Sequence, residues 1–352
     1  MLTTTQMLAT TTTWPDFAMR PNTTSPEGQV PVTGPITSCP DIIPVTAAVN
    51  DPQSVYSTPT SWATDYAGQV SEGAPNYLYV RAKNFDAGAE TGTISLYAVG
   101  CGLIQWPSLW INNPLNVQGG GTTVALSATT NQEIVVGAQP FYWDAPPPPA
   151  GSDHYCLFSL VDTPKTPNPL LHTNVPDTYN NMSDLVTNSL NVGWKNVAEV
   201  SNDVPTWTHQ MTMQIPPGAE ANQRLHVYAF GTQGTVNGQL QVSSGDSQGF
   251  NPPIQIDQTT IASSSQTYGT LTTPTPGEAR TVLNVSFWKG NSNPGFTDRI
   301  TVVCGWVPND AEVIASQIEA GTAHRLPSEL AGDEPLWEVP IGAMHYQFSA
   351  TA

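Results

Sequence analysis

The cysteines and histidines have the most reactive side chains in this sequence, and their spacing limits what they could do. His154 and Cys156 stand two residues apart in the strand-like run HYCLFSLVD, so both face one side and could form an edge of a metal site. A core cysteine beside a hydrogen-bonded histidine explains the same spacing, and we adopt that interpretation. The four cysteines lie far apart with no CxxC pair, which argues against zinc. We therefore expect no metal and no cofactor.

The redox state and location of the chain stay open at this level. Cys39, Cys101, Cys156 and Cys304 allow one or two disulfides in three pairings if the protein is exported, and four buried thiols are an equal alternative. The N-terminus lacks the charged and apolar regions of a signal peptide. The low charge and the abundance of small polar residues are typical of secreted bacterial surface proteins. We expect an extracellular or particle-associated protein, with the cytoplasm as the alternative.

Catalytic motifs are scarce. Gly245-Asp246-Ser247 resembles the nucleophile phrase of chymotrypsin-like proteases, but that chemistry also needs a histidine base and a buried aspartate. None of His154, His172, His209 and His226 stands in a suitable phrase, so a turn is the better explanation. The chain has no HExxH, P-loop, GxSxG or EF-hand motif. We expect a protein that is not an enzyme and has no catalytic residues.

Clustered aromatic residues are stronger candidates for function. Trp106 and Trp110 flank Pro107, and Phe141, Tyr142 and Trp143 are consecutive. Because neighbouring side chains of a strand face opposite sides, part of the second group must point away from one core. Exposed aromatics beside polar residues form sugar-binding or subunit surfaces. We predict a binding surface at Trp106, Trp110, Tyr142 and Trp143; the alternative is that the arm or the other domain covers these residues.

Composition excludes several classes of protein. The 352 residues include 10 Lys plus Arg and 28 Asp plus Glu, a formal charge of −18. Such a chain repels phosphate and anionic lipid, so we expect no nucleic-acid partner. No run approaches 18 apolar residues, so we expect no membrane-spanning helix. The 33 prolines exclude long helices and coiled coils.

The elements that must position these residues are short strands between turn residues. The first group is 76–83, 93–99, 122–127, 133–138, 141–143 and 154–162, and the second is 192–200, 208–215, 224–231, 238–244, 253–260, 280–288 and 298–307. Their spacing of roughly 8–14 residues predicts antiparallel sandwiches. Val313, Ile314 and Ile318 predict one short helix over about 310–320, capped by Asn309 or Asp310 and ended by Gly321.

These elements predict an all-β fold of two tandem antiparallel, immunoglobulin-like β-sandwiches. The predicted units are an extended Thr- and Pro-rich arm over 1–38, a first sandwich over 39–165, a second over 166–308, and a short helix with an extended tail over 309–352. A loop over about 163–185 with four prolines is the predicted boundary between the sandwiches.

Several phrases resemble the tandem CARDB-like, immunoglobulin-like modules of bacterial exoproteins. They are Pro40-Asp41-Ile42, PNYLYVRAKN over 75–84, the strand 92–98 with IQWP over 104–107, HYCLFSLVDTP over 154–164, and NSLNVGWKNV over 188–197. They follow one another in the same order over about 40–200. The resemblance implies the sandwich fold and export, and accessory or binding roles rather than catalysis.

Three functions follow as hypotheses. The first is a structural protein that forms a homo-oligomer through its arm and tail, with Trp14, Trp337, Tyr346 and Phe348 docking on neighbouring copies. The second is an extracellular module that binds a glycan or a cell surface. The third is a secreted toxin or pore-forming effector, suggested by nearly uncharged Ser- and Thr-rich strand segments.

Overall fold

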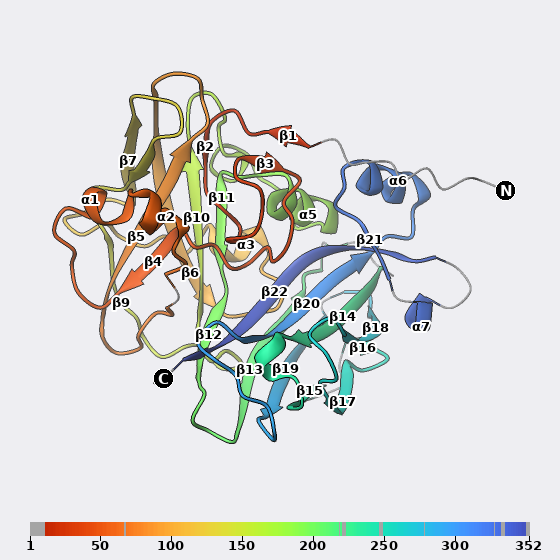
Figure 1. The fold of residues 1–352 in the computed structure, drawn as a ribbon. Coiled ribbons are helices and arrows are strands. Elements are labelled where there is room, and N and C mark those ends of the chain that lie inside the picture. The colour runs from red at the N-terminus through yellow and green to blue at the C-terminus, as the bar shows by residue number, and fades with distance from the viewer. Residues whose placement is uncertain are drawn as a thin grey trace.

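Two antiparallel β-sandwiches make up the fold of this computed structural model (Figure 1). The structure describes residues 11–66, 68–217, 219, 223–245, 249–277, 279–326, 328–331 and 335–349. The first sandwich, red to green in Figure 1, and the second, green to blue, lie against each other. The predicted all-β class is confirmed, with most predicted strands found at or within a few residues of their expected bounds.

The first sandwich is built from two sheets. One has the strand order β11 (Val192–Lys195), β10 (Tyr155–Asp162), β6 (Glu90–Gly100) and β7 (Thr123–Ala128). In the other, β5 (Pro75–Asn84) pairs with four short strands: β2 (Phe17–Ala18), β4 (Ile42–Val45), β8 (Ile134–Val136) and β9 (Phe141–Asp144). Between the sheets lies a core to which β5, β6, β7 and β10 all contribute.

The sheet of β6 and β10 is buried on both faces. Leu157 and Val161 of β10 face the first sandwich's own core. Cys156, Phe158 and Leu160, one residue out of phase, belong to a larger core that continues into the second sandwich. A strand covered on both sides reads as a nearly continuous apolar run, which explains the HYCLFSLVD sequence.

The second sandwich also has two sheets. One follows β12 (Val197–Ser201), β22 (Trp337–Ser349), β20 (Arg299–Val307), β14 (Arg224–Gly231), β18 (Tyr268–Pro274) and β16 (Phe250–Asn251), with β21 (His324–Arg325) beside β22. The other follows β13 (Thr206–Ile215), β19 (Ala279–Trp288), β15 (Gln239–Ser244) and β17 (Gln255–Thr260). The pair β12–β22 is parallel, because the chain crosses the molecule between these strands.

The predicted tail is part of this sandwich. Residues 337–349 form β22, which pairs with β12 on one side and β20 on the other. The strand is apolar on both faces, so it is stable only inside a sheet. The strands also cross the predicted boundary at residue 165, since β11 pairs with β10 of the first sandwich. Division of the chain into separately folding domains stays a prediction.

The described part of the predicted arm packs on its own chain. Phe17 and Ala18 pair with β5 as β2, while the short strands β1 (Thr12–Thr13) and β3 (Gln29–Val30) pair with each other. The buried carboxylate of Asp41 then joins the guanidinium groups of Arg20 and Arg81, at 2.5 and 2.8 Å. Burial of Val32 and Ile36 in the larger core completes the attachment. The segment is therefore an intramolecular strap rather than a free extension.

The predicted C-terminal helix is confirmed as α6 (Ala311–Glu319). The carboxylate of Asp310 accepts hydrogen bonds from the backbone of Glu312 and Val313, and Gly321 follows the helix at a φ of 74°. Six other short helices are α1 (Pro52–Tyr56), α2 (Pro59–Ala63), α3 (Pro107–Trp110), α4 (Pro169–His172), α5 (Tyr179–Thr187) and α7 (Ser328–Ala331). No helix in the described segments has both the length and the apolarity needed to cross a bilayer.

Helix α5 lies inside the segment predicted to be a loop. Its buried Tyr179, Met182, Leu185 and Val186 follow helical spacing and pack into the larger core, where the helix lies against β22. The prolines that precede it end at Pro176, so they do not interrupt the helix. The helical spacing was therefore visible in the sequence but was masked by the proline-rich context.

The two sandwiches and the strap meet at one buried side chain, Asn196, between β11 and β12. Its amide nitrogen donates to the carbonyl oxygens of Gly102 and Ala343, at 3.1 and 2.8 Å. Its amide oxygen accepts from Nε2 of His154 and Sγ of Cys156, both at 2.9 Å. Its backbone N–H donates to Thr37 of the strap. All donors and acceptors of the side chain are thus used by segments far apart in the sequence.

A second buried polar group, His345 on β22, also contacts the strap. The hydroxyl of Thr37 donates to the carbonyl oxygen of Ala343, so it accepts from Nε2–H of His345. Nδ1 then accepts from the hydroxyl of Thr301 at 3.0 Å. This arrangement holds the ring neutral. Burial, aided by the charge of Arg299, lowers the pKa of His345 well below its usual value.

We expect Asn196→Ala to lower the free energy of unfolding by about 3–5 kcal/mol, because the carbonyl oxygen of Gly102 and Nε2 of His154 both lose their only described hydrogen-bond partner. Urea unfolding measures the loss. Asn112→Ala, at an exposed asparagine with one local hydrogen bond, is the matched control and should cost under about 0.5 kcal/mol. Similar losses in both variants would contradict the role given to Asn196.

We expect His345 to contribute a loss of stability as the pH falls below about 6.5, because the unfolded chain then binds a proton at residue 345 that the folded chain rejects. His154, whose pKa is raised in the folded chain, contributes in the opposite direction. At pH 5 the contribution of His345 is about 2 kcal/mol. His345→Gln should reduce the loss between pH 7 and pH 5 by that amount in urea unfolding, whereas the exposed His324→Gln should not. Identical pH dependence in wild type and His345→Gln would refute this explanation.

Candidate functional site

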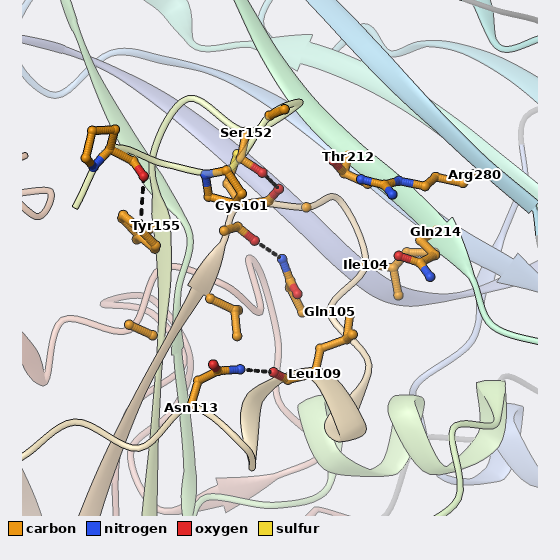
Figure 2. Close-up of a pocket in the computed structure, with 17 residues that line it drawn as sticks. Cys101, Ile104, Gln105, Leu109, Asn113, Ser152, Tyr155, Thr212, Gln214 and Arg280 are labelled. Atoms are coloured by element: carbon orange, nitrogen blue, oxygen red, sulfur yellow. Dashed lines mark hydrogen bonds between the residues drawn. The ribbon is translucent and has the colours of Figure 1, made fainter. Parts of the chain in front are cut away.

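A groove lies where the two sandwiches meet (Figure 2). Its volume of about 440 Å³ falls within the roughly 300–1,000 Å³ of small-molecule sites. The first sandwich contributes the end of β6, the segment 100–113 with α3, and the loop 147–155. The second contributes Thr212 and Gln214 of β13 and Arg280 of β19. Gln214 and Arg280 are paired neighbours on adjacent strands.

The first sandwich's side of the groove is held in shape by local hydrogen bonds. Nε2 of Gln105 donates to the carbonyl oxygen of Gly100, and Nδ2 of Asn113 donates to that of Leu109, at 2.8 and 2.7 Å. Among the residues described, none donates a hydrogen bond to the side-chain oxygen of Gln105 or Asn113. The groove therefore offers fixed polar atoms to a ligand. Leu109 and Tyr155 supply apolar surface beside them.

The groove differs in charge from the rest of the chain. Among the described residues its lining contains Arg280 and no carboxylate, although the chain has 28 acidic and 10 basic residues. Arg280 is exposed and forms no ion pair with any residue in the described ranges. Figure 2 shows its side chain running past Thr212 along the second sandwich's wall. An exposed guanidinium without a partner can bind a carboxylate or another anion.

The prediction that Trp106 and Trp110 are surface aromatics is wrong, because each is only 1% exposed. The indole N–H of Trp106 donates to the carbonyl oxygen of Gln214 at 2.6 Å, across the junction. Trp110 stacks on Phe158 with ring centroids 4.0 Å apart, and its N–H donates to Gln105. Trp106 thus contacts the second sandwich and Tyr179 of α5, which is the burial that the sequence left open as an alternative, whereas Trp110 packs within the first sandwich. Because each ring donates a hydrogen bond to a residue that lines the groove, Gln214 or Gln105, the two tryptophans fix the position of its walls.

Tyr142 and Trp143 are half-buried on β9, away from the other two tryptophans. The hydroxyl of Tyr142 donates to Asp144, and its ring packs on Tyr77. Trp143 packs edge-on against Tyr155, with ring centroids 4.6 Å apart. Because Tyr155 lines the groove, Trp143 supports the groove from one side. The predicted binding role of these two residues stays a prediction.

The aromatics predicted to join neighbouring copies lie in the chain's own fold. Tyr346 and Phe348 are buried in the second sandwich on β22, so they are not available to dock on another copy. Trp14 is half-buried against the larger core, and its N–H donates to the carbonyl oxygen of Phe17. Trp337 is half-buried at the start of β22.

Beside the groove, four side chains with metal-binding or nucleophilic chemistry come together. Nδ1 of His154 and Nδ1 of His209 each lie 2.6 Å from a different carboxylate oxygen of Asp153. Sγ of Cys101 lies 3.5 Å from the oxygen that His154 contacts. His209 comes from β13 of the second sandwich, and the other three from the first. The sequence analysis missed this cluster, because residues 101, 153 and 209 are distant in the chain.

The electrostatics of this cluster are dominated by Asp153. Burial alone would raise the pKa of Asp153, but hydrogen bonds from His154 and His209 hold it well below the usual range. Burial alone would lower the pKa of His154, yet Cys101 and Asp153 together raise it to about 10. His154 is therefore an imidazolium at neutral pH that donates from both nitrogens, one to Asp153 and the other to Asn196. The cluster ties the sandwiches together.

The cysteine and histidine are not arranged as a nucleophile and its base. A base must accept the thiol proton on a ring nitrogen, but both nitrogens of His154 are occupied by Asp153 and Asn196. All four cysteines are buried free thiols, so the disulfide alternative is not the one that the structure adopts. Cys156 contacts Asn196 through its thiol, as expected for a core cysteine near a hydrogen-bonded histidine. Asp246 and Ser247 lie outside the described residues.

No family model matches the chain, and neither does any curated protein. Similar solved structures include the CupB6 tip adhesin from Pseudomonas aeruginosa, at 11% identity and a TM-score of 0.22 over 80% of this chain and 92% of that chain. The collagen adhesin CNA from S. aureus has 8% identity and a TM-score of 0.22 over 79% of this chain and 88% of that chain. CfaE, the adhesive subunit of CFA/I fimbria of enterotoxigenic Escherichia coli, has 7% identity and a TM-score of 0.20 over 97% of this chain and 94% of that chain. Likenesses at such TM-scores carry no argument about function, and the CARDB-like resemblance is not matched by a family model.

Proposed function

We propose that this protein is a non-enzymatic surface-binding module that holds an acidic glycan in the groove between its two sandwiches. The observation that carries this proposal is the groove's lining, which combines the guanidinium of Arg280 with fixed amide oxygens; among the described residues, Arg280 has no ion-pair partner and the lining has no carboxylate. A sugar carboxylate would pair with Arg280, and the sugar hydroxyls would donate to Gln105 and Asn113.

The apolar part of the groove supports a sugar rather than a small inorganic anion. Tyr155 offers a ring face held in place by Trp143 and by the hydrogen bond from its hydroxyl to Pro147. Such rigid, amphipathic side chains contribute contact area at little entropic cost. Leu109, 36% exposed, extends this surface. A pyranose ring has one apolar face and a polar edge, which match these two kinds of wall.

The charge of the whole chain gives this arrangement selectivity. At −18, the protein repels most polyanions, so a bound acidic ligand must be recognised locally rather than attracted by the overall field. An extracellular or particle-associated location, where such glycans are found, fits the composition and forms part of the proposal.

Binding to a glycan array should distinguish variants of Arg280 from wild type. We expect Arg280→Ala to weaken binding of acidic glycans by about 10- to 100-fold, since one charge-assisted contact is worth about 1.5–3 kcal/mol. Arg280→Lys should recover only part of the loss, because lysine lacks the planar fork. Arg325→Ala, which removes an exposed arginine of β21, is the matched control and should bind as wild type does.

Two outcomes would overturn the proposal. Equal binding by wild type and Arg280→Ala would exclude the groove as the acidic-glycan site. Absence of binding by wild type to every glycan on the array would exclude this function as a whole.

The homo-oligomer predicted from the arm and tail stays a prediction with weaker support, because residues 12–38 and 337–349 pack within their own chain. We expect light scattering on a sizing column to give a mass near the 37.6 kDa of one chain. A large, discrete multiple of that mass would instead restore assembly as the leading function. Dye release from vesicles tests the pore-forming alternative.

A further inference from the structure

We propose that Cys101, Asp153, His154 and His209 form a binding site for one divalent cation of the zinc class at the junction of the two sandwiches. The ligand atoms of Cys101, Asp153 and His154 lie within 4.8 Å of one another. Nδ1 of His209 lies 2.6 Å from Asp153 but outside this set of three, so it becomes the fourth donor only by moving closer to Cys101 and His154. This site lies beside the groove and does not depend on the proposed glycan.

The donor set selects the kind of ion. One thiolate sulfur, two imidazole nitrogens and one carboxylate oxygen suit zinc and similar borderline metals. Calcium and magnesium prefer sites built only from oxygen. Four protein ligands also complete a tetrahedron, as in structural zinc sites, which leave no open position for chemistry.

The distances among Cys101, Asp153 and His154 are close to those that such an ion needs, whereas His209 must move closer to Cys101 and His154. With zinc's bond lengths, tetrahedral donors lie roughly 3.3–3.7 Å apart. Sγ of Cys101 and the carboxylate of Asp153 are already 3.5 Å apart. The two separations of 2.6 Å between imidazole and carboxylate are those of hydrogen bonds. Binding therefore requires each imidazole to lose the proton that faces Asp153, and the carboxylate to withdraw by roughly 1 Å.

A second observation, the orientation of Asn196, points independently to a ligand at His154. Because both amide hydrogens of Asn196 donate to backbone carbonyls, its oxygen must face His154 and accept from Nε2–H. A neutral His154 then carries its lone pair on Nδ1, which faces the cluster. Histidines that ligate metals are held in this way, with the other ring nitrogen donating to an oxygen.

The surroundings of the cluster also fit a bound ion. The ring of Tyr346 packs on that of His209 with centroids 5.3 Å apart. The hydroxyl of Tyr346 is buried without a hydrogen-bond partner in the described part of the chain. Cys101 and His154 are 1% and 4% exposed, whereas the side chain of His209 is 28% exposed. The ion would thus enter past His209, the one ligand from the second sandwich, and would join the two sandwiches directly.

The test uses the full-length protein after treatment with a chelator. Cobalt(II) is titrated as a spectroscopic probe, and zinc is then added in competition, with native mass spectrometry to count ions. We expect one ion per chain, a thiolate-to-cobalt charge-transfer band, displacement by zinc, and a rise of a few degrees in the thermal midpoint.

Variants locate the ion. Cys101→Ser should abolish the charge-transfer band, and His209→Gln should weaken zinc binding by at least about tenfold. Cys304→Ala and His172→Gln, which remove a buried cysteine and an exposed histidine outside the cluster, are the matched controls and should bind as wild type does. Because His209 is partly exposed, its variant remains informative if Cys101→Ser fails to fold.

The inference is overturned if wild type binds neither cobalt nor zinc stoichiometrically. It is also overturned if His209→Gln binds zinc as tightly as wild type, or if the control variants lose binding to the same extent. None of these outcomes bears on glycan binding by Arg280, so the two proposals fail separately.

Discussion

The hydrogen bonds of Asn196 are the interaction on which the arrangement of the molecule depends. One buried amide satisfies backbone carbonyls near β6 and on β22, together with the side chains of His154 and Cys156. A buried amide without partners is costly, so only the arrangement that brings all of these segments together is stable. Hydrophobic contacts alone would allow the two sandwiches to slide, because apolar packing is not directional. The amide selects one orientation.

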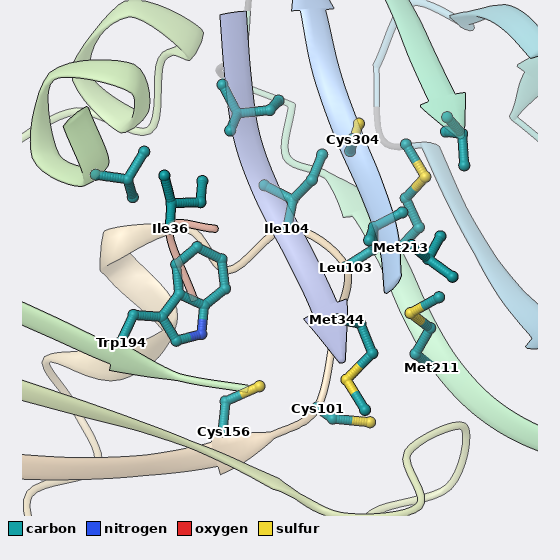
Figure 3. Packing of buried hydrophobic residues seen from close by; sticks show 14 of the residues in the cluster. Ile36, Cys101, Leu103, Ile104, Cys156, Trp194, Met211, Met213, Cys304 and Met344 are labelled. Carbon is teal, nitrogen blue, oxygen red and sulfur yellow. The ribbon is translucent and has the colours of Figure 1, made fainter. Parts of the chain in front are cut away.

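That orientation has consequences for both sites. The core shared by the sandwiches passes directly beneath the junction, where Met211 and Met213 of β13 and Met344 of β22 gather near Cys101 (Figure 3). Flexible methionines fill the irregular space between two curved sheets. The groove lies at the same junction. The groove and the Cys101 cluster are therefore two products of one junction, and a change that shifts the sandwiches would alter both.

Because charged residues are scarce in this chain, its few buried ionic groups are important for holding segments in place. Asp41 pairs with Arg20 and Arg81 beneath the strap, and Asp153 pairs with His154 and His209 at the junction. Asp41 is joined to two partners from distant segments, and Asp153 to its neighbour His154 and to the distant His209. Removing one partner of such a group leaves a buried charge uncompensated, which is far more costly than losing an exposed pair. Each cluster therefore ties distant segments of this chain together.

Local patterns in the sequence determined the secondary structure, because alternation, turn residues and caps act within a few residues. The strand of residues 154–162 and the helix capped by Asp310 were predictable for that reason. Which faces of those strands are covered was not, since coverage comes from segments far away in the chain. Trp106 and Trp110 were predicted to be exposed, yet both are buried, Trp106 against Gln214 of the second sandwich and Trp110 against Phe158 of β10. Only the tertiary structure brings together Cys101, Asp153, His154 and His209, because hydrogen bonding among buried polar groups is a property of the assembled chain and leaves no periodic signal in the sequence.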